Sequence, residues 1–98
     1  MKFKITDLPL QYSKLTPSER REVRELYRNL QKDLCWFCGA VLTGAPAATV
    51  QEKEINLKLF PIGFLKNPIH LQHHHSTDLT EGAVHAKCNA VLWQYYGR

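Results

Sequence analysis

The 98-residue sequence contains only three cysteines and has no apolar run long enough to cross a membrane. A membrane-spanning helix needs about 20 mostly apolar residues, so a membrane protein is not expected. Three cysteines cannot all pair within the chain, and the stretch MKFKITDLPL lacks the apolar run of a secretory signal peptide. We therefore expect a cytoplasmic protein, in which clustered cysteines bind metal more often than they form disulfides.

Acidic side chains are also fewer than basic ones. Thirteen Lys and Arg against nine Asp and Glu give a formal net charge of +4, which fits a polyanionic partner. The length corresponds to one domain, residues 1–98, in which a small core alone provides little stability. A bound structural metal would supply the stability that such a core lacks.

The segment Thr16-Pro17-Ser18-Glu19 has the pattern of a helix start. Thr16 can accept a backbone hydrogen bond, Pro17 has the φ of a first helical residue, and Glu19 can reach back as in a capping box. We expect a helix over residues 17–34. Its apolar stripe, spaced by three and four residues, consists of Val23, Leu26, Tyr27, Leu30 and Leu34.

A second stripe of this helix is basic and comprises Arg20, Arg24, Arg28 and Lys32. Acidic residues lie between these positions, so the stripe is interpreted either as a solvated face with internal ion pairs or as a phosphate-contacting face.

After the helix, the pattern predicts an irregular region and then two short strands and a helix. Residues 44–68 read as a loop or arm, and partial alternation at 50–60 indicates a short strand or extended segment. We expect strands at 69–73 and 82–84, a turn at 76–81, and a helix that ends near Gly97. Residues 69–97 would then form a ββα unit within an α+β fold.

The strongest motif is Cys35-x-x-Cys38 combined with His85-x-x-Cys88. Two short-spaced pairs supply four donors suited to tetrahedral Zn²⁺ at a structural site. Gly39 relieves the sharp turn that follows the first pair. The alternative is three ordinary buried cysteines and an unrelated histidine, which the paired spacing disfavours.

Three histidines in a row, His73, His74 and His75, form the second cluster. In a strand, His73 and His75 would share one side, and His74 would share the other side with Gln72. Such a run by itself is typical of a surface or an adventitious metal site. Its position directly before the hairpin and the zinc pair favours a functional role.

The stretch LQHHHSTDLTEGAVHAKCNAVLW, preceded by CWFC, resembles the HNH or His-Me finger endonucleases, and specifically the zinc-stapled recombination endonuclease VII type. The resemblance implies a small ββα-metal domain with a zinc knuckle and an N-terminal helix. It also implies hydrolysis of DNA phosphodiester bonds with Mg²⁺ or Mn²⁺, in a bacterial or phage-infected cell. DNA would be bound through its backbone phosphates, and the oligomeric state stays open, a homodimer included.

By this resemblance His73 is the general base, His75 the second motif histidine, and Asn89 a ligand of the catalytic cation. The zinc ligands implied are Cys35, Cys38, His85 and Cys88. Asn89 has a plainer alternative as a polar residue at a helix start.

The sequence departs from the family at the catalytic cation site. Gln72 stands where the family has Asp or His, and His74 stands where Asp is common. The cation site would then consist of Gln72, His74 and Asn89, which favours Mn²⁺ over Mg²⁺. The alternative function is a weakly active or inactive zinc-stapled adaptor of the same fold that binds nucleic acid or regulates another protein.

Other side chains allow less specific predictions. Further phosphate contacts would come from Arg20, Arg24, Arg28, Lys87 and Arg98. Aromatic residues beside a zinc knuckle are expected to pack in the core rather than to stack on nucleic-acid bases. In this sequence they are Trp36, Trp93, Tyr95 and Tyr96. His70 is expected to pack at the strand start without a further role.

Overall fold

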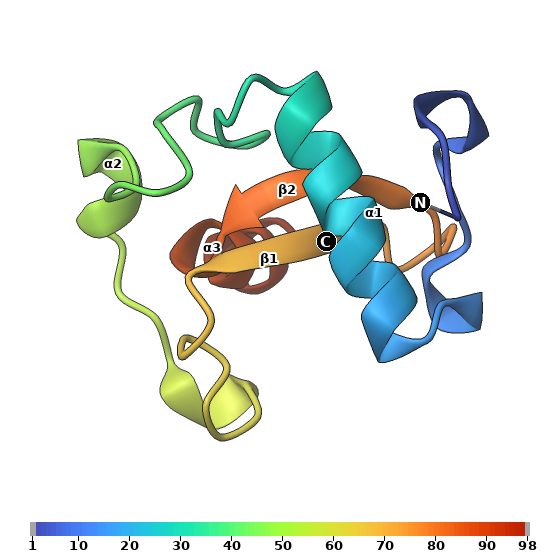
Figure 1. The fold of residues 1–98 in the computed structure, drawn as a ribbon. Helices are drawn as coiled ribbons and strands as arrows, with labels where there is room; N and C mark the ends of the chain where they lie inside the picture. Colours follow the sequence, from blue (N-terminus) through green and yellow to red (C-terminus); the bar gives the residue numbers. More distant parts are fainter. Residues whose placement is uncertain (1, 98) are drawn as a thin grey trace.

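The fold is a β-hairpin placed between two helices (Figure 1), as seen in a computed structural model that describes residues 2–97. Strands β1 (Ile69–His73) and β2 (Thr80–His85) pair antiparallel. Helix α1 (Pro17–Leu30) lies across one face of the hairpin, and α3 (Ala86–Tyr96) lies behind the other. The α+β prediction is confirmed, and so is the order of two strands followed by a helix.

Helix α1 starts where the sequence predicts and ends earlier. The Glu19 N–H donates to Thr16 Oγ1 over 3.2 Å, and the Thr16 N–H donates to Glu19 Oε1 over 2.8 Å, which completes the capping box. The helix stops at Leu30 because Lys32 and Asp33 adopt left-handed backbone, with φ of 55° and 60°. The predicted end at residue 34 is therefore wrong.

The early helix end changes which apolar residues are buried. Val23, Leu26 and Tyr27 are buried under the hairpin, whereas Leu30 and Leu34 are 52% and 42% exposed. The Tyr27 hydroxyl lies 2.8 Å from Thr80 Oγ1 and joins α1 to β2. The largest fully buried apolar side chains are Val23, Leu42, Val84, Cys88 and Val91.

The hairpin is longer than predicted on its second strand. Strand β1 has the predicted bounds, but β2 covers 80–85 instead of 82–84, with an irregularity in the register at Gln72 and His73. The N-terminal segment continues the pairing: the Thr80 N–H donates to Leu10 O over 2.8 Å, and the Tyr12 N–H donates to Asp78 O over 2.7 Å. This pairing, which the sequence did not indicate, brings Tyr12 to the end of β1.

The region 44–68 forms short helical turns rather than a strand. Helix α2 spans Ala48–Gln51, and a 3₁₀ turn spans Leu57–Leu59. The region passes along α3, where the Tyr95 hydroxyl donates to Glu54 O over 2.7 Å. Of the two alternatives predicted for 50–60, a short strand or an extended segment, the strand does not form: Leu57 and Leu59, which would share the buried side of such a strand, are both exposed. None of the helices described is long and apolar enough to span a membrane.

Gly82 in β2 has no room for a side chain. A Cβ there would lie 2.7 Å from Trp36 Cγ and 2.7 Å from Gln31 Oε1. Both neighbours are fixed, because the Gln31 amide pairs with the backbone of Ala83 and the Trp36 N–H donates to Ala83 O over 3.0 Å. The close contact joins the end of α1 and the cysteine turn to β2.

Gly82→Ala should therefore lower the free energy of unfolding by about 1–3 kcal/mol, the usual cost of overpacking. Urea denaturation followed by circular dichroism measures the change. Gly44→Ala is the matched control, because a Cβ there meets Val41 O at an ordinary 3.6 Å. Equal stability of the two variants would contradict the close packing of Gln31 and Trp36 against Gly82.

Candidate functional site

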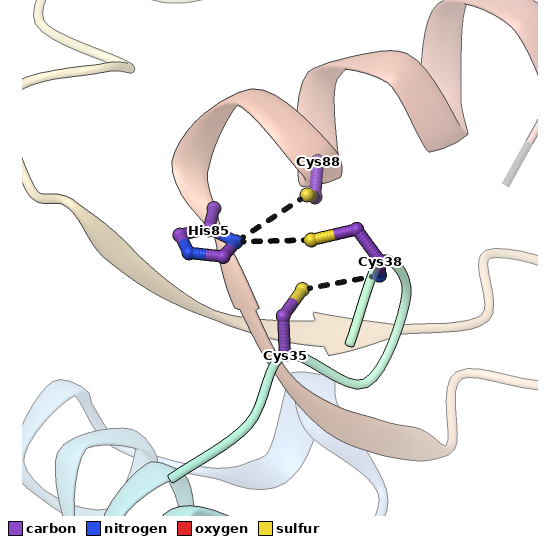
Figure 2. Close-up of side chains that lie close together, drawn as sticks. All are labelled: Cys35, Cys38, His85 and Cys88. Carbon is purple, nitrogen blue, oxygen red and sulfur yellow. Dashed lines mark hydrogen bonds between the residues drawn. The ribbon is translucent and has the colours of Figure 1, made fainter. Parts of the chain in front are cut away.

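The four predicted zinc ligands come together at one point (Figure 2). Cys35 and Cys38 lie on the turn after α1, His85 ends β2, and Cys88 is in the first turn of α3. Their donor atoms all lie within 4.8 Å of one another. His85 Nδ1 is 3.5 Å from both Cys38 Sγ and Cys88 Sγ. Ordinary Zn–S and Zn–N bonds in a tetrahedron place N and S about 3.6 Å apart, so the cluster fits a zinc ion.

The orientation of His85 suits metal binding. Its Nε2 lies 2.9 Å from Val41 O, which can only accept, so Nε2 carries the proton. Figure 2 shows Nδ1 directed at the sulfur atoms of Cys38 and Cys88, and its lone pair is therefore free to bind a metal there. Metal-bound histidines commonly donate their second N–H to a carbonyl in this way.

The cysteine turn is closed by its own backbone. The Cys35 N–H donates to Ala40 O over 2.8 Å, and the Gly39 N–H donates to Cys35 O over 3.0 Å. Gly39 has φ of 79°, a conformation that favours glycine, as expected from its place after the first pair. The Cys38 N–H points at Cys35 Sγ over 3.5 Å. Local bonds thus hold the turn and Cys35 Sγ, whereas Cys38 Sγ contacts His85 across the site.

The close approach of the thiols gives Cys35 and Cys88 different pKa values. A hydrogen bond from Cys88, opposed by burial and supported by backbone N–H groups, lowers the pKa of Cys35 to about 4. The same hydrogen bond and burial raise the pKa of Cys88. A divalent cation would stabilise all the thiolates together, so its binding would release protons. Cys88 and His85 are 0% and 3% exposed, a closed set of four ligands typical of structural sites.

A separate cavity of about 290 Å³ brings His73, His75 and Asn89 together. Asn89 comes from α3, and the histidines come from the end of β1 and the turn after it. The His73 and His75 ring centroids are 4.6 Å apart, so the two rings lie on the same side as predicted. The Tyr12 ring stacks on His73 at 3.8 Å and fixes its plane.

The surroundings of His73 favour its neutral form. Burial, with the nearby His75 and Arg20 charges, lowers its pKa, while Asp78 and Glu81 act in the opposite direction. A neutral imidazole at neutral pH can accept a proton, which is the property a general base needs.

Asn89 has a partner that the sequence did not indicate. Its Nδ2 lies 3.0 Å from His70 Nδ1, and since an amide nitrogen only donates, His70 must accept. Burial lowers the pKa of His70, which favours its neutral ring, and the bond from Asn89 then places the single ring proton on Nε2. The bond leaves Asn89 Oδ1 for another ligand. His70 and Asn89 are 19 positions apart, so only the folded arrangement of β1 against α3 brings them together.

Gln72 and His74 lie outside this cavity. Gln72 is 1% exposed, and its Nε2 donates to His73 O over 2.9 Å and points toward Glu81 Oε1. His74 Nδ1 accepts from the Ser76 N–H over 3.1 Å. Strand alternation explains the separation, because Leu71 and His73 face the cavity and Gln72 faces the opposite side. The structure therefore does not bring Gln72 and His74 together with Asn89.

The remaining predicted contacts are mixed. Arg28 pairs with Asp33 and Glu25, as expected for a solvated face. The Lys87 ammonium donates to Gln51 O over 2.6 Å, and Arg98 lies outside the described residues. The core prediction is wrong for the aromatics, since all four are exposed: Trp36, Trp93, Tyr95 and Tyr96.

Comparisons with protein families, with curated proteins and with solved structures gave no match for this chain. Function is therefore inferred from the two sites: a closed set of soft donors suited to zinc, and a cavity with a neutral histidine and an amide oxygen.

Proposed function

We propose that this chain is a DNA endonuclease of the HNH or His-Me finger type, dependent on a divalent cation and stabilised by one structural zinc. The observation that carries the proposal is the cavity in which His73 and His75, from β1 and its turn, face Asn89 from α3. The Cys₃His cluster lies at the start of the same helix and would fix its position.

In this proposal His73 accepts a proton from the water that attacks the scissile phosphate. Its stacking on Tyr12 orients the ring, and its lowered pKa keeps it unprotonated. Asn89, positioned by His70, presents its amide oxygen to the same space. A divalent cation, when bound, supplies charge stabilisation at the phosphoryl oxygens.

The cavity fits Mg²⁺ poorly. Of the described residues that line it, none is a carboxylate, and the side chains with metal-binding atoms are Asn89, His73 and His75. Mg²⁺ prefers carboxylate oxygens, whereas Mn²⁺ also accepts nitrogen ligands. We therefore propose Mn²⁺ as the better activator.

The position of Gln72 favours a second candidate function. Because its amide is buried and bonded away from the cavity, a family ligand position is lost. The alternative proposal is a zinc-stapled module that binds nucleic acid without cleaving it.

Incubation with supercoiled plasmid distinguishes the two proposals. The endonuclease should convert plasmid to nicked or linear DNA, faster in Mn²⁺ than in Mg²⁺, and the zinc-loaded protein should cleave little when neither cation is added. Gel electrophoresis over a time course measures the rates. DNA binding without cleavage in either metal would favour the module.

A further inference from the structure

A second cavity, of about 370 Å³, adjoins the His73 cavity and has a basic lining. Helix α1 contributes three guanidinium groups, from Arg20, Arg21 and Arg24. No acidic residue is among the described residues that line it. Four residues line both cavities, so the two spaces are neighbours: Tyr12, Phe64, Leu71 and Asn89.

Two of the arginines are oriented by the protein and retain unused donors. The Arg20 guanidinium lies 4.0 Å from the centre of the Tyr12 ring, and Arg24 Nη1 donates to Ile69 O over 3.4 Å. Within the described structure the buried Nε atoms of both have no hydrogen-bond partner, although Arg24 Nε lies 3.5 Å from a Glu25 carboxylate oxygen. Each guanidinium also carries further N–H donors, and an anion in the cavity that these arginines line would offer acceptors to them.

Tyr12 connects the basic cavity to His73. Its ring stacks on His73 at 3.8 Å and on the Arg20 guanidinium at 4.0 Å. Two groups so close to one ring centre must occupy its opposite faces, so a single aromatic ring separates the guanidinium from the imidazole. An anion held by Arg20 would thus lie one ring away from the proposed general base.

We propose that the arginine cavity is a phosphate subsite, which binds the nucleic-acid backbone phosphate next to the one presented to His73. This inference deepens the proposed function and depends on it for the identity of the neighbouring site. Guanidinium groups match phosphate oxygens in charge and geometry. A nucleic acid is favoured over an acidic peptide because aromatic rings that can stack on bases line the adjoining space, namely Phe60, Phe64 and Trp93.

Arg21→Gln tests the subsite with little effect on folding. Arg21 is exposed on α1 and forms no ion pair with another described residue, and glutamine is also a good helix former. Lys32→Gln is the control, with the same loss of charge at a residue beyond the end of α1 that lines neither cavity. Affinity for a labelled duplex oligonucleotide is measured by fluorescence anisotropy at several salt concentrations, without added Mg²⁺ or Mn²⁺.

Arg21→Gln should weaken binding and lower the salt slope by about 0.9, the value of one lost phosphate contact on duplex DNA. Lys32→Gln should keep the wild-type slope, and Arg21→Glu should weaken binding further. An equal loss in the Arg21→Gln and Lys32→Gln proteins would overturn the subsite, because it would indicate a diffuse charge effect. Displacement of the DNA by an equal charge of poly-glutamate would also overturn it, in favour of an acidic polypeptide.

The binding assay and the plasmid assay test the two proposals separately, so that either proposal can be contradicted while the other is supported. A lowered salt slope in the Arg21→Gln protein without cleavage by any protein supports the phosphate subsite and contradicts the endonuclease. Cleavage by the wild type with unchanged binding by Arg21→Gln and Arg21→Glu supports the endonuclease and contradicts the subsite.

Discussion

Removal of the metal by a chelator should unfold this protein. The Cys₃His cluster joins the turn after α1 to the start of α3, with Cys38 and His85 separated by 47 positions. Apparent zinc binding in small domains is about 10–16 kcal/mol, similar to the total stability of about 5–15 kcal/mol that native domains have. Loss of the ion would also leave crowded thiols in the core, with Cys88 0% exposed.

His85→Ala makes the same test without a chelator. It removes one ligand and the bond to Val41 O, so the purified chain should lose zinc and its cooperative thermal transition. His74→Ala is the control, since His74 contacts only its own turn among the bonds described and lies outside the cluster. Elemental analysis of the wild type should give about one zinc per chain. A folded, metal-free wild type, or a His85→Ala protein as stable as His74→Ala, would contradict a structural zinc.

Features set by neighbouring residues could be predicted from the sequence. The capping box at Thr16 and Glu19 needs only a three-residue spacing, and the structure contains it. The two ligand pairs could also be predicted, because each is recognised from the short spacing of its own two residues. The structure brings the donor atoms of both pairs together. The left-handed cap at Gly97 is likewise a local property of glycine.

Features set by contacts between residues that are not adjacent in the chain could not be predicted. The left-handed backbone at Lys32 and Asp33 is unusual for these residue types, so the helix appeared to continue to 34. It is held by an ion pair of 2.7 Å between Arg28 and Asp33 and by the closing bridge between Leu34 and Val41. The stacking of Tyr12 on His73 likewise depends on the N-terminal segment pairing with the hairpin.

In the His73 cavity, too, some features could be predicted from the sequence and others could not. Alternation along β1 placed His73 and His75 together, and the family resemblance indicated Asn89. The resemblance also grouped Gln72 with them, because matching a motif assigns roles to sequence positions and does not show in which direction each side chain points. In the structure Gln72 pairs with Gly82 of β2, and its side chain points away from the cavity. The residue of β1 that contacts Asn89 is His70.

His73→Ala should abolish DNA cleavage while the fold, zinc and DNA affinity are kept. A general base contributes roughly 10²- to 10⁴-fold to rate, so nicking of supercoiled plasmid should fall by that factor. His73 is not among the Cys₃His ligands, and its loss removes one stacking contact with Tyr12, worth about 0.5–1.5 kcal/mol. Circular dichroism, zinc content and oligonucleotide binding should therefore resemble those of the wild type.

His74→Ala separates a specific role of His73 from general effects of the histidine run. Its side chain lies outside the cavity, and its Nδ1 accepts a bond from Ser76 within its own turn, so nicking should stay near the wild-type rate. Added imidazole should restore part of the activity to His73→Ala and none to a protein damaged elsewhere, because only a missing base leaves a space that imidazole can fill. Undiminished nicking by a clean His73→Ala preparation would refute the general base. Equal losses in the His73→Ala and His74→Ala proteins would also contradict the general base, because they would indicate a general effect of the histidine run rather than a specific role of His73.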